Sequence, residues 1–345
     1  MTFLLLLSLF LQAAVSSPPA HLLSVKKLWD QAPHSAFTDL LRFQNRWYCV
    51  FREGEAHADG AGKIRVLTSN DGERWESAAV LETAGRDLRD PKIVPTSDGR
   101  LMILGGATNV AARSTDLYSF VSFSRNGKDW SPPQRVTIDG KENQWLWRVV
   151  WHKGVAYGVA YTAEPPQTPP QHRKMWAWVC RSRDGIRYER ISPDFVESNE
   201  AALSFGEDGV LTVVLRSNAQ PSQALLAEAR APYTNWTSKP LHSENWDSQL
   251  GGPQILRLPD GRLLAAGRLY KDKMTRTGLV LIDPASGTMT EMLVLPSKGD
   301  NSYPGLVWYG NKLWLSYYSS HEGKSAIYLA QIDLPTRGKP GPAKK

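Results

Sequence analysis

Residues 69–75 read SNDGERW, and the pattern returns as SRNGKDW at 124–130 and as SRDGIRY at 182–188. Each copy has a serine, an Asp or Asn two residues later, a glycine and then an aromatic residue. The pattern indicates a tight turn, because the Asp or Asn side chain bonds nearby backbone while glycine takes a positive φ. Since the copies start 55 and 58 residues apart, they predict a repeated structural unit.

A second repeat, two apolar runs around a short turn, has the same period. Its turns centre on Asn45, Gly99, Gly154, Gly209, Gly261 and Asn311. β-rich runs around Asp-Gly, Asn or Gly turns are typical of β-hairpins, and amphipathic helical periodicity is essentially missing. We therefore predict one all-β domain over residues 21–335, a six-bladed β-propeller with four-stranded antiparallel blades. Residues 21–29 can supply the missing outer strand of the last blade, which closes the ring.

The composition is that of a globular protein, with 41% hydrophobic and 22% charged residues among 345. Two cysteines are too few for a disulfide scaffold, and Cys49 and Cys180 lie in apolar strand patterns, which predicts buried thiols. The net charge of +7 is spread along the chain, so we expect no nucleic-acid partner, while an acidic small ligand remains open. The 13 tryptophans and 12 tyrosines suit packing between sheets and also sugar-binding surfaces.

Residues 3–15 form an apolar run, followed by small residues and Pro18-Pro19. This arrangement predicts a secretory signal peptide over residues 1–17, and the alternative is an uncleaved anchor. No other run is long enough to cross a bilayer, so we expect a secreted or periplasmic protein without stable membrane insertion. We further expect a monomer with a flexible basic tail at 336–345.

A propeller brings the starts of its inner strands and the ends of its second strands to one face. Counting seven residues past each hairpin turn gives Arg52, Gly106, Tyr161, Arg216, Arg268 and Tyr318. Three arginines on one face can clamp a carboxylate, because guanidinium is planar, always charged and bidentate. The alternative is that each arginine pairs with a neighbouring Asp or Glu as a structural strut.

Further polar residues lie near the starts of the inner strands, and we expect them on the same face. They are Asp39, Arg89, Asp90, Arg148, Glu200 and Tyr303. The loop after Arg52 adds Glu53, His57 and Asp59. Loops on this face are where a general acid would enter.

With these motifs the chain resembles the sialidase (neuraminidase) superfamily, whose Asp boxes, or BNR repeats, have the Ser-x-Asp-x-Gly-x-x-Trp pattern. The resemblance covers nearly the whole mature chain and implies a six-bladed propeller with exo-α-sialidase-like activity. It implies that Tyr303 is the nucleophile and Glu200 its base, since an unaided tyrosine with a pKa near 10 attacks poorly. Arg216 and Arg268 match two of the three arginines with which the family binds the substrate carboxylate.

Two positions depart from the family. Its first arginine lies in an Arg-Ile-Pro motif, whereas residues 36–39 here read AFTD, so Arg52 or Arg89 would have to replace it. The family's catalytic Asp falls near His57 or Asp59, and a histidine can act as acid or base at neutral pH.

Three functions stay open. The first is an exo-glycosidase that removes a terminal acidic sugar, sialic acid or a similar compound, from glycans with retention. The second is a non-catalytic carbohydrate-binding propeller. The third is a lyase or glycosidase for uronic-acid glycans, in which His57 and Tyr303 would act as acid and base. None needs a cofactor or a metal, and we expect no catalytic metal site, because the seven histidines show no Glu-x-x-His spacing; a structural Ca²⁺ stays open.

Overall fold

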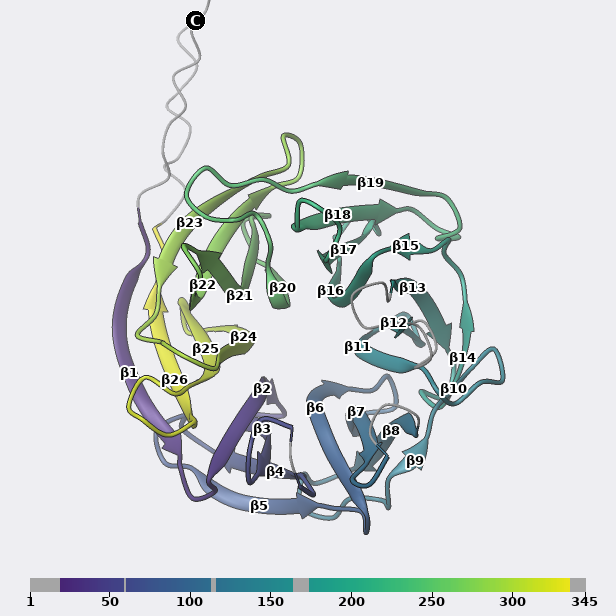
Figure 1. The fold of residues 1–345 in the computed structure, drawn as a ribbon, viewed down its shortest axis with the longest axis vertical. Helices are drawn as coiled ribbons and strands as arrows, with labels where there is room; N and C mark the ends of the chain where they lie inside the picture. Colours follow the sequence, from purple (N-terminus) through teal and green to yellow (C-terminus); the bar gives the residue numbers. More distant parts are fainter. Residues whose placement is uncertain (1–18, 59, 113–115, 164–173, 336–345) are drawn as a thin grey trace, which may run out of the picture.

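A computed structural model describes residues 19–58, 60–112, 116–163 and 174–335. Over these residues the chain is all-β and forms six antiparallel blades around a central axis (Figure 1), which confirms the predicted six-bladed propeller. The predicted leader at 1–17 and basic tail at 336–345 lie outside the described residues. Within the described part of the chain, no helix has the length and apolarity needed to cross a membrane.

Each blade consists of four strands, listed here from the axis outward. Blade 1 contains β2 (His34–Phe43), β3 (Arg46–Gly54), β4 (Lys63–Ser69) and β5 (Glu76–Leu81). Blade 2 contains β6 (Arg86–Pro95), β7 (Leu101–Asn109), β8 (Leu117–Ser124) and β9 (Gln134–Arg135). Blade 3 contains β11 (Trp145–His152), β12 (Val155–Ala163), β13 (Met175–Ser182) and β14 (Arg187–Arg190), with the short strands β10 (Thr137–Ile138) and β15 (Phe195–Val196) beside them.

The second half of the chain repeats this order. Blade 4 contains β16 (Ser198–Phe205), β17 (Leu211–Ser217), β18 (Gln223–Ala229) and β19 (Trp236–Pro240). Blade 5 contains β20 (Gly251–Arg257), β21 (Leu263–Lys271), β22 (Met274–Asp283) and β23 (Thr288–Val294). Blade 6 contains β24 (Asn301–Tyr309), β25 (Lys312–Ser319), β26 (Ala326–Asp333) and β1 (His21–Trp29).

The ring is closed by the first strand, as predicted. β1 pairs antiparallel with β26, from His21 opposite Asp333 to Trp29 opposite Ile327. Both ends of the described chain therefore lie in blade 6 (Figure 1).

The turn at residues 69–75 has the predicted structure. The Oγ of Ser69 accepts the N–H of Gly72 at 2.8 Å, and Oδ1 of Asp71 accepts two backbone N–H groups at 2.8 and 2.9 Å. The same bonds recur in the copies at 124–130 and 182–188, and the three glycines have φ between 73° and 79°. Ser69 pairs with Trp47, so the turn lies at the hairpin end of its blade, on the face opposite the inner-strand starts.

The core consists of layers between blades. Six clusters of buried apolar residues each join one blade to the next around the ring. Cys49 and Cys180 are buried free thiols in two of these layers, which confirms their prediction.

Every inner strand carries a β-bulge at the equivalent place. The pairing register shifts between Ala36/Asp39, Arg89/Lys92, Leu146/Arg148, Ser198/Ala201, Gly251/Gln254 and Ser302/Gly305. In four blades the bulged residue has a positive φ: 61° at Phe37, 50° at Asp90, 55° at Gly252 and 50° at Tyr303. A bulge re-aims side chains and leaves backbone outside the ladder, so these six bulges determine what faces the end of the channel.

Candidate active site

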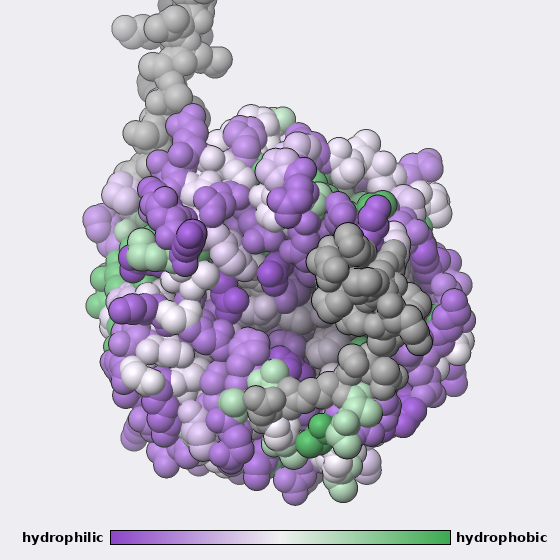
Figure 2. Space-filling model, in the orientation of Figure 1, coloured by the Kyte–Doolittle hydropathy of each residue, from purple (hydrophilic) through white to green (hydrophobic). Residues whose placement is uncertain are grey.

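A pocket of about 370 Å³ lies at the inner-strand bulges. Its lining includes Phe37, Asp90, Trp147, Glu200 and Tyr303, one residue from each of five inner strands. Trp145 and Tyr161 add a stacked aromatic pair, with ring centroids 6.1 Å apart and planes at 10°. The middle of the face seen in Figure 2 is hollowed, and mostly hydrophilic residues border the hollow.

Tyr303 and Glu200, which lie 103 positions apart in the chain, meet in this pocket. The Tyr303 hydroxyl donates to Oε1 of Glu200 at 2.6 Å. The other carboxylate oxygen accepts Nη1 of Arg216 at 2.9 Å and the backbone N–H of Gly252 at 2.7 Å. Burial by itself raises the pKa of the Glu200 carboxyl, but the charge of Arg216 and these hydrogen bonds outweigh it and bring the pKa below its ordinary value. Glu200 is therefore a carboxylate at neutral pH, placed to take the phenolic proton.

The phenol is held as a neutral group until it loses that proton. Burial, together with the negative charge of Glu200, raises the pKa of Tyr303 well above its ordinary value, while Arg268 and Arg216 act in the opposite direction. The guanidinium carbon of Arg268 lies 5.3 Å from the Tyr303 ring centroid. Arg268 over the ring and Arg216 on Glu200 are thus two cations near the phenol, and their charge favours a negative oxygen on Tyr303.

Gly252 allows this packing because it has no side chain. A Cβ there would lie 2.7 Å from Cγ of Tyr303 and within 2.9 Å of both Cδ atoms. The glycine backbone therefore touches the ring and at the same time donates to Glu200. It holds Tyr303 and Glu200 in register.

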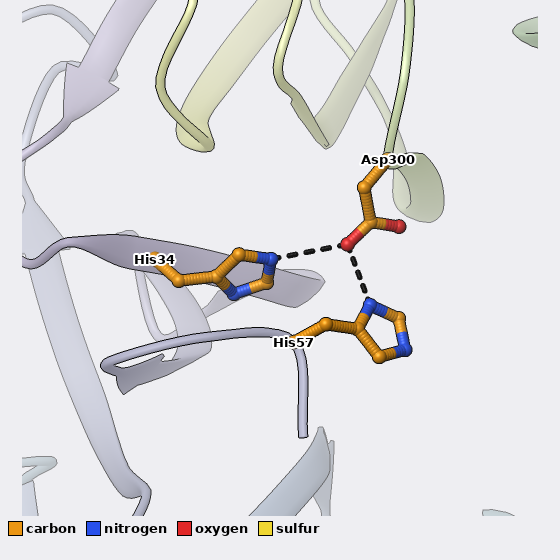
Figure 3. Close-up of side chains that lie close together, drawn as sticks. All are labelled: His34, His57 and Asp300. Atoms are coloured by element: carbon orange, nitrogen blue, oxygen red, sulfur yellow. Dashed lines mark hydrogen bonds and ion pairs between the residues drawn. The ribbon is translucent and has the colours of Figure 1, made fainter. Parts of the chain in front are cut away.

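Asp300 is the centre of a second cluster at the mouth of the site. Figure 3 shows one carboxylate oxygen, Oδ2, reached by Nε2 of His34 at 3.0 Å and by Nδ1 of His57 at 2.6 Å. Oδ1 accepts the hydroxyl of Tyr318 at 2.7 Å and Nη2 of Arg268 at 3.1 Å. Burial by itself raises the pKa of Asp300, but the bonds and charges around it lower the pKa far below its ordinary value.

Sequence reasoning missed His34 and Asp300. They lie 266 positions apart, and Asp300 stands one residue before β24, just outside the inner-strand starts that were inspected. Extending that search by one residue would have included it. Of the two predicted acid/base candidates, His57 is in place beside Asp300, half exposed, while Asp59 lies outside the described residues.

His34, His57 and Asp300 are also the described residues that could hold a metal ion, since their donor atoms lie within 4.8 Å of one another. The Arg268 guanidinium, 3.1 Å from Oδ1, opposes a divalent cation there by charge repulsion. The hydrogen bonds to Asp300 use Nε2 of His34 and Nδ1 of His57, while Nδ1 of His34 is buried without a hydrogen-bond partner among the described residues.

Arg52 is a correction to the predicted substrate arginines. Its side chain is fully buried, its Nε lies 2.7 Å from Oδ1 of Asp87, and its Nη1 donates to the Ala56 carbonyl at 2.8 Å. Gly54 and Gly62 leave the space that the guanidinium fills. Arg52 is thus a strut beneath the site, the alternative that the sequence had left open.

Asp39 and Arg148 are a second correction. Nη1 of Arg148 lies 3.2 and 3.1 Å from the two carboxylate oxygens of Asp39, and Asp39 also accepts the N–H of Ile93 at 3.0 Å. Both line a separate channel cavity of about 380 Å³. Because each bulge shifts the register, Phe37 and Trp147 face the pocket in their place.

Arg89 and Asp90 line the pocket as predicted residues of that face. The Arg89 guanidinium carbon lies 5.3 Å from the Phe37 ring centroid, and its nitrogens lie 3.7 Å from the carboxylates of Asp87 and Asp90. Burial raises the pKa of Asp90, and Arg89 and Lys92 partly offset this effect. Burial also lowers the pKa of Lys92, to about 8.

No family model matches the sequence, and no curated protein matches it. Among solved structures the chain is similar to a protein of unknown function from Dyadobacter fermentans, at 19% identity and a TM-score of 0.77 over 92% of this chain and 100% of that one. It is similar to Trypanosoma rangeli sialidase in complex with sialic acid, at 13% identity and a TM-score of 0.68, over 92% of this chain and 58% of that one.

The same sialidase has been solved with 2,3-difluorosialic acid as a covalent intermediate. A β-1,3-galactosidase of glycoside hydrolase family 43 is similar at 14% identity and a TM-score of 0.52, over 75% of this chain and 93% of that one. At these identities the likeness shows the fold: a six-bladed β-propeller similar to that of Trypanosoma sialidase.

Proposed function

We propose that the protein is a retaining exo-glycosidase of the sialidase type. The observation that carries the proposal is the 2.6 Å bond from the Tyr303 hydroxyl to Glu200, with Arg216 bonded to Glu200 and Arg268 beside the Tyr303 ring. The covalent intermediate of the T. rangeli sialidase supports it, since the two folds are alike. The repeated turns fit the Asp boxes of that superfamily.

In the first step the Tyr303 oxygen bonds the anomeric carbon, and the phenolic proton passes to Glu200. The bond from that carbon to the leaving oxygen breaks, and His57 gives this oxygen a proton. In the second step His57 takes a proton from water, the water oxygen bonds the anomeric carbon, the Tyr303–carbon bond breaks, and Glu200 returns the proton. Two displacements at one carbon retain its configuration.

Asp300 orients His57 for this role. Its bond to Nδ1 fixes the orientation of the ring and leaves Nε2 to exchange a proton with the leaving group. The exposed position of His57 suits exchange of protons with water.

The sequence analysis expected an acidic sugar as the substrate, bound by arginines. Arg216 and Arg268 already bind the carboxylates of Glu200 and Asp300, at 2.9 and 3.1 Å. Arg89, in the pocket wall, differs from these two. Its nearest carboxylates, those of Asp87 and Asp90, lie 3.7 Å away, beyond hydrogen-bond distance.

The test is hydrolysis of fluorogenic glycosides, an α-sialoside, uronides and uncharged sugars, by wild type and Tyr303→Phe. Release by wild type alone, with a product anomer that NMR shows to be retained, is the expected result. Equal release by Tyr303→Phe would remove the proposed nucleophile. Sugar binding without release would favour the carbohydrate-binding propeller, and an unsaturated product absorbing in the near ultraviolet would favour the lyase.

We also propose export of the protein, on the apolar run at residues 3–15. Cell fractionation with N-terminal sequencing tests it. A mature chain beginning near residue 18 outside the cytoplasm is expected, and a cytoplasmic chain beginning at Met1 would contradict it.

A further inference from the structure

We propose that Asp300 occupies, from within the protein, the place on Arg268 that a substrate carboxylate would take, and that the sugar accepted by this pocket is uncharged. The inference rests on the proposed glycosidase function and specifies its substrate class.

The position of the nucleophile determines which arginines matter. In a sugar of the sialic acid type the carboxylate is attached to the anomeric carbon, the atom that Tyr303 would attack. Its receivers must therefore flank Tyr303, and the two guanidinium groups that do so are those of Arg216 and Arg268.

Both receivers already bond a carboxylate of the protein, and Nε of Arg216 is buried without a hydrogen-bond partner among the described residues. Arg216 donates to Glu200, the base, at 2.9 Å. On Arg268, Nε donates to the Asn301 carbonyl at 3.0 Å, and Nη2 bonds that carbonyl at 2.6 Å and Oδ1 of Asp300 at 3.1 Å. The Asn301 carbonyl thus fills the Nε–Nη2 edge, which would grip a carboxylate side-on, and Asp300 takes a further bond to Nη2.

Asp300 is held too well to be displaced by a second carboxylate. Four groups donate to it: His34, His57, Tyr318 and Arg268. A substrate carboxylate would have to replace these bonds or lie beside Asp300, where like charges repel.

Each of the three arginines at the site already lies near a carboxylate of the protein. Three arginines at the site face three carboxylates, namely Arg89, Arg216 and Arg268 against Asp90, Glu200 and Asp300. The walls are aromatic, and aromatic faces pack well on the apolar C–H faces of uncharged sugar rings.

Binding to Tyr303→Phe tests the inference without turnover. Matched pairs of methyl glycosides, galactoside with galacturonide and glucoside with glucuronide, and methyl α-sialoside are titrated by calorimetry, beside uncharged pentosides and N-acetylhexosaminides. We expect an uncharged glycoside to bind, with its carboxylated counterpart about tenfold weaker or worse. The inference would be overturned if the sialoside or a uronide bound more tightly than the uncharged glycosides, including the case in which Arg89 binds its carboxylate. It would also be overturned if no uncharged sugar bound.

Removing Asp300 should reopen the anion site. Asp300→Ala is expected to bind free sialic acid or acetate at least about tenfold more tightly than the protein that keeps Asp300. The reason is that Arg268 can then form a charge-assisted hydrogen bond with the carboxylate of the ligand. Asp98→Ala is the matched control, since Asp98 bonds Arg100 at 2.8 Å in an exposed hairpin turn, and it should gain nothing. Should Asp300→Ala not fold, Asp300→Asn keeps the shape and removes the charge. A folded variant with no gain would refute the inference.

The two proposals fail separately. Tyr303-dependent hydrolysis of a sialoside would support the glycosidase and overturn the uncharged substrate. Selective binding of uncharged sugars without hydrolysis of any glycoside would support the uncharged ligand and contradict the glycosidase.

Discussion

Gly252→Ala tests whether the close contact between this glycine and Tyr303 sets the rate. The added Cβ would lie 2.7 Å from Cγ of the ring, where ordinary contact begins at 3.4 Å, so the ring must retreat by 0.7 Å (3.4 − 2.7). The Tyr303 hydroxyl, which now lies 2.6 Å from Oε1 of Glu200, moves with the ring. Because misplacing a reacting group by about 1 Å can cost about 100-fold, we expect kcat to fall by roughly 100-fold.

The backbone gives this variant a second cost, which a control must match. Gly252 has a φ of 55°, and an alanine in the left-handed region costs about 1–2 kcal/mol of stability. Gly99→Ala carries the same kind of cost at a φ of 80°, with no atom within 4 Å of the added Cβ. Gly252→Ala should lose at least as much stability as Gly99→Ala in urea unfolding, because the contact with the ring adds to the backbone cost, and Gly252→Ala alone should lose turnover.

The assay is steady-state hydrolysis of whichever fluorogenic glycoside the wild type cleaves. We expect kcat to fall with little change in KM, because the pocket walls that bind the sugar stay in place. A kcat for Gly252→Ala within about threefold of wild type, or an equal loss in Gly99→Ala, would refute the positioning role of Gly252.

Three further variants test the rest of the structure. Arg52→Met leaves Asp87 buried without its partner, so urea unfolding should show a loss of about 3–5 kcal/mol, whereas a substrate-binding role would raise KM in a stable protein. Asp71→Ala should lower the Tm with unchanged kcat/KM. Backbone N–H bonds lower the pKa of this Asp, so the stability advantage of the wild type should be full above about pH 5 and should shrink progressively as the pH falls below about 4. The folded chain lowers the pKa of Lys92 to about 8, so the unfolded chain binds more protons above that pH. Wild-type stability should therefore rise by up to about 3 kcal/mol between about pH 8 and 10.5 relative to Lys92→Met, and parallel profiles would contradict the shift.

The fold could be predicted because its signals are local. A turn such as residues 69–75 needs only a serine, an Asp, a glycine and their own backbone, and it recurs with the period of the blades. The closing strand followed from counting, since the last unit lacked one strand and residues 21–29 were left over. Buried thiols at Cys49 and Cys180 followed from apolar alternation.

The site could be predicted only in part, because the bulges change which side chains face it. Glu200 and Tyr303 were found by their place at the strand starts, but the same rule chose Asp39 and Arg148, which lie past the bulge and bond each other. The bulge leaves one trace in the sequence, a proline after its positive-φ residue in three blades, at Pro91, Pro253 and Pro304. That trace is too weak to set the register without coordinates.

Asp300 could not be assigned to the site from the sequence. Its role depends on partners 266 and 243 positions away, which no local pattern connects. Arg52 was open to two interpretations from sequence, and only its burial against Asp87 decides between them.

The pairing of β1 with β26 imposes an order on folding. Its contacts join residues 312 positions apart (333 − 21), and closing a loop of that length costs about 5 kcal/mol in chain entropy beyond a constant. The strand made first in synthesis is therefore the last to find its partner. Until it arrives, β26 presents an unpaired edge on which a second chain can add a strand. The productive yield of folding is then governed by a race between two encounters, one within the chain and one between chains, and only the second depends on concentration.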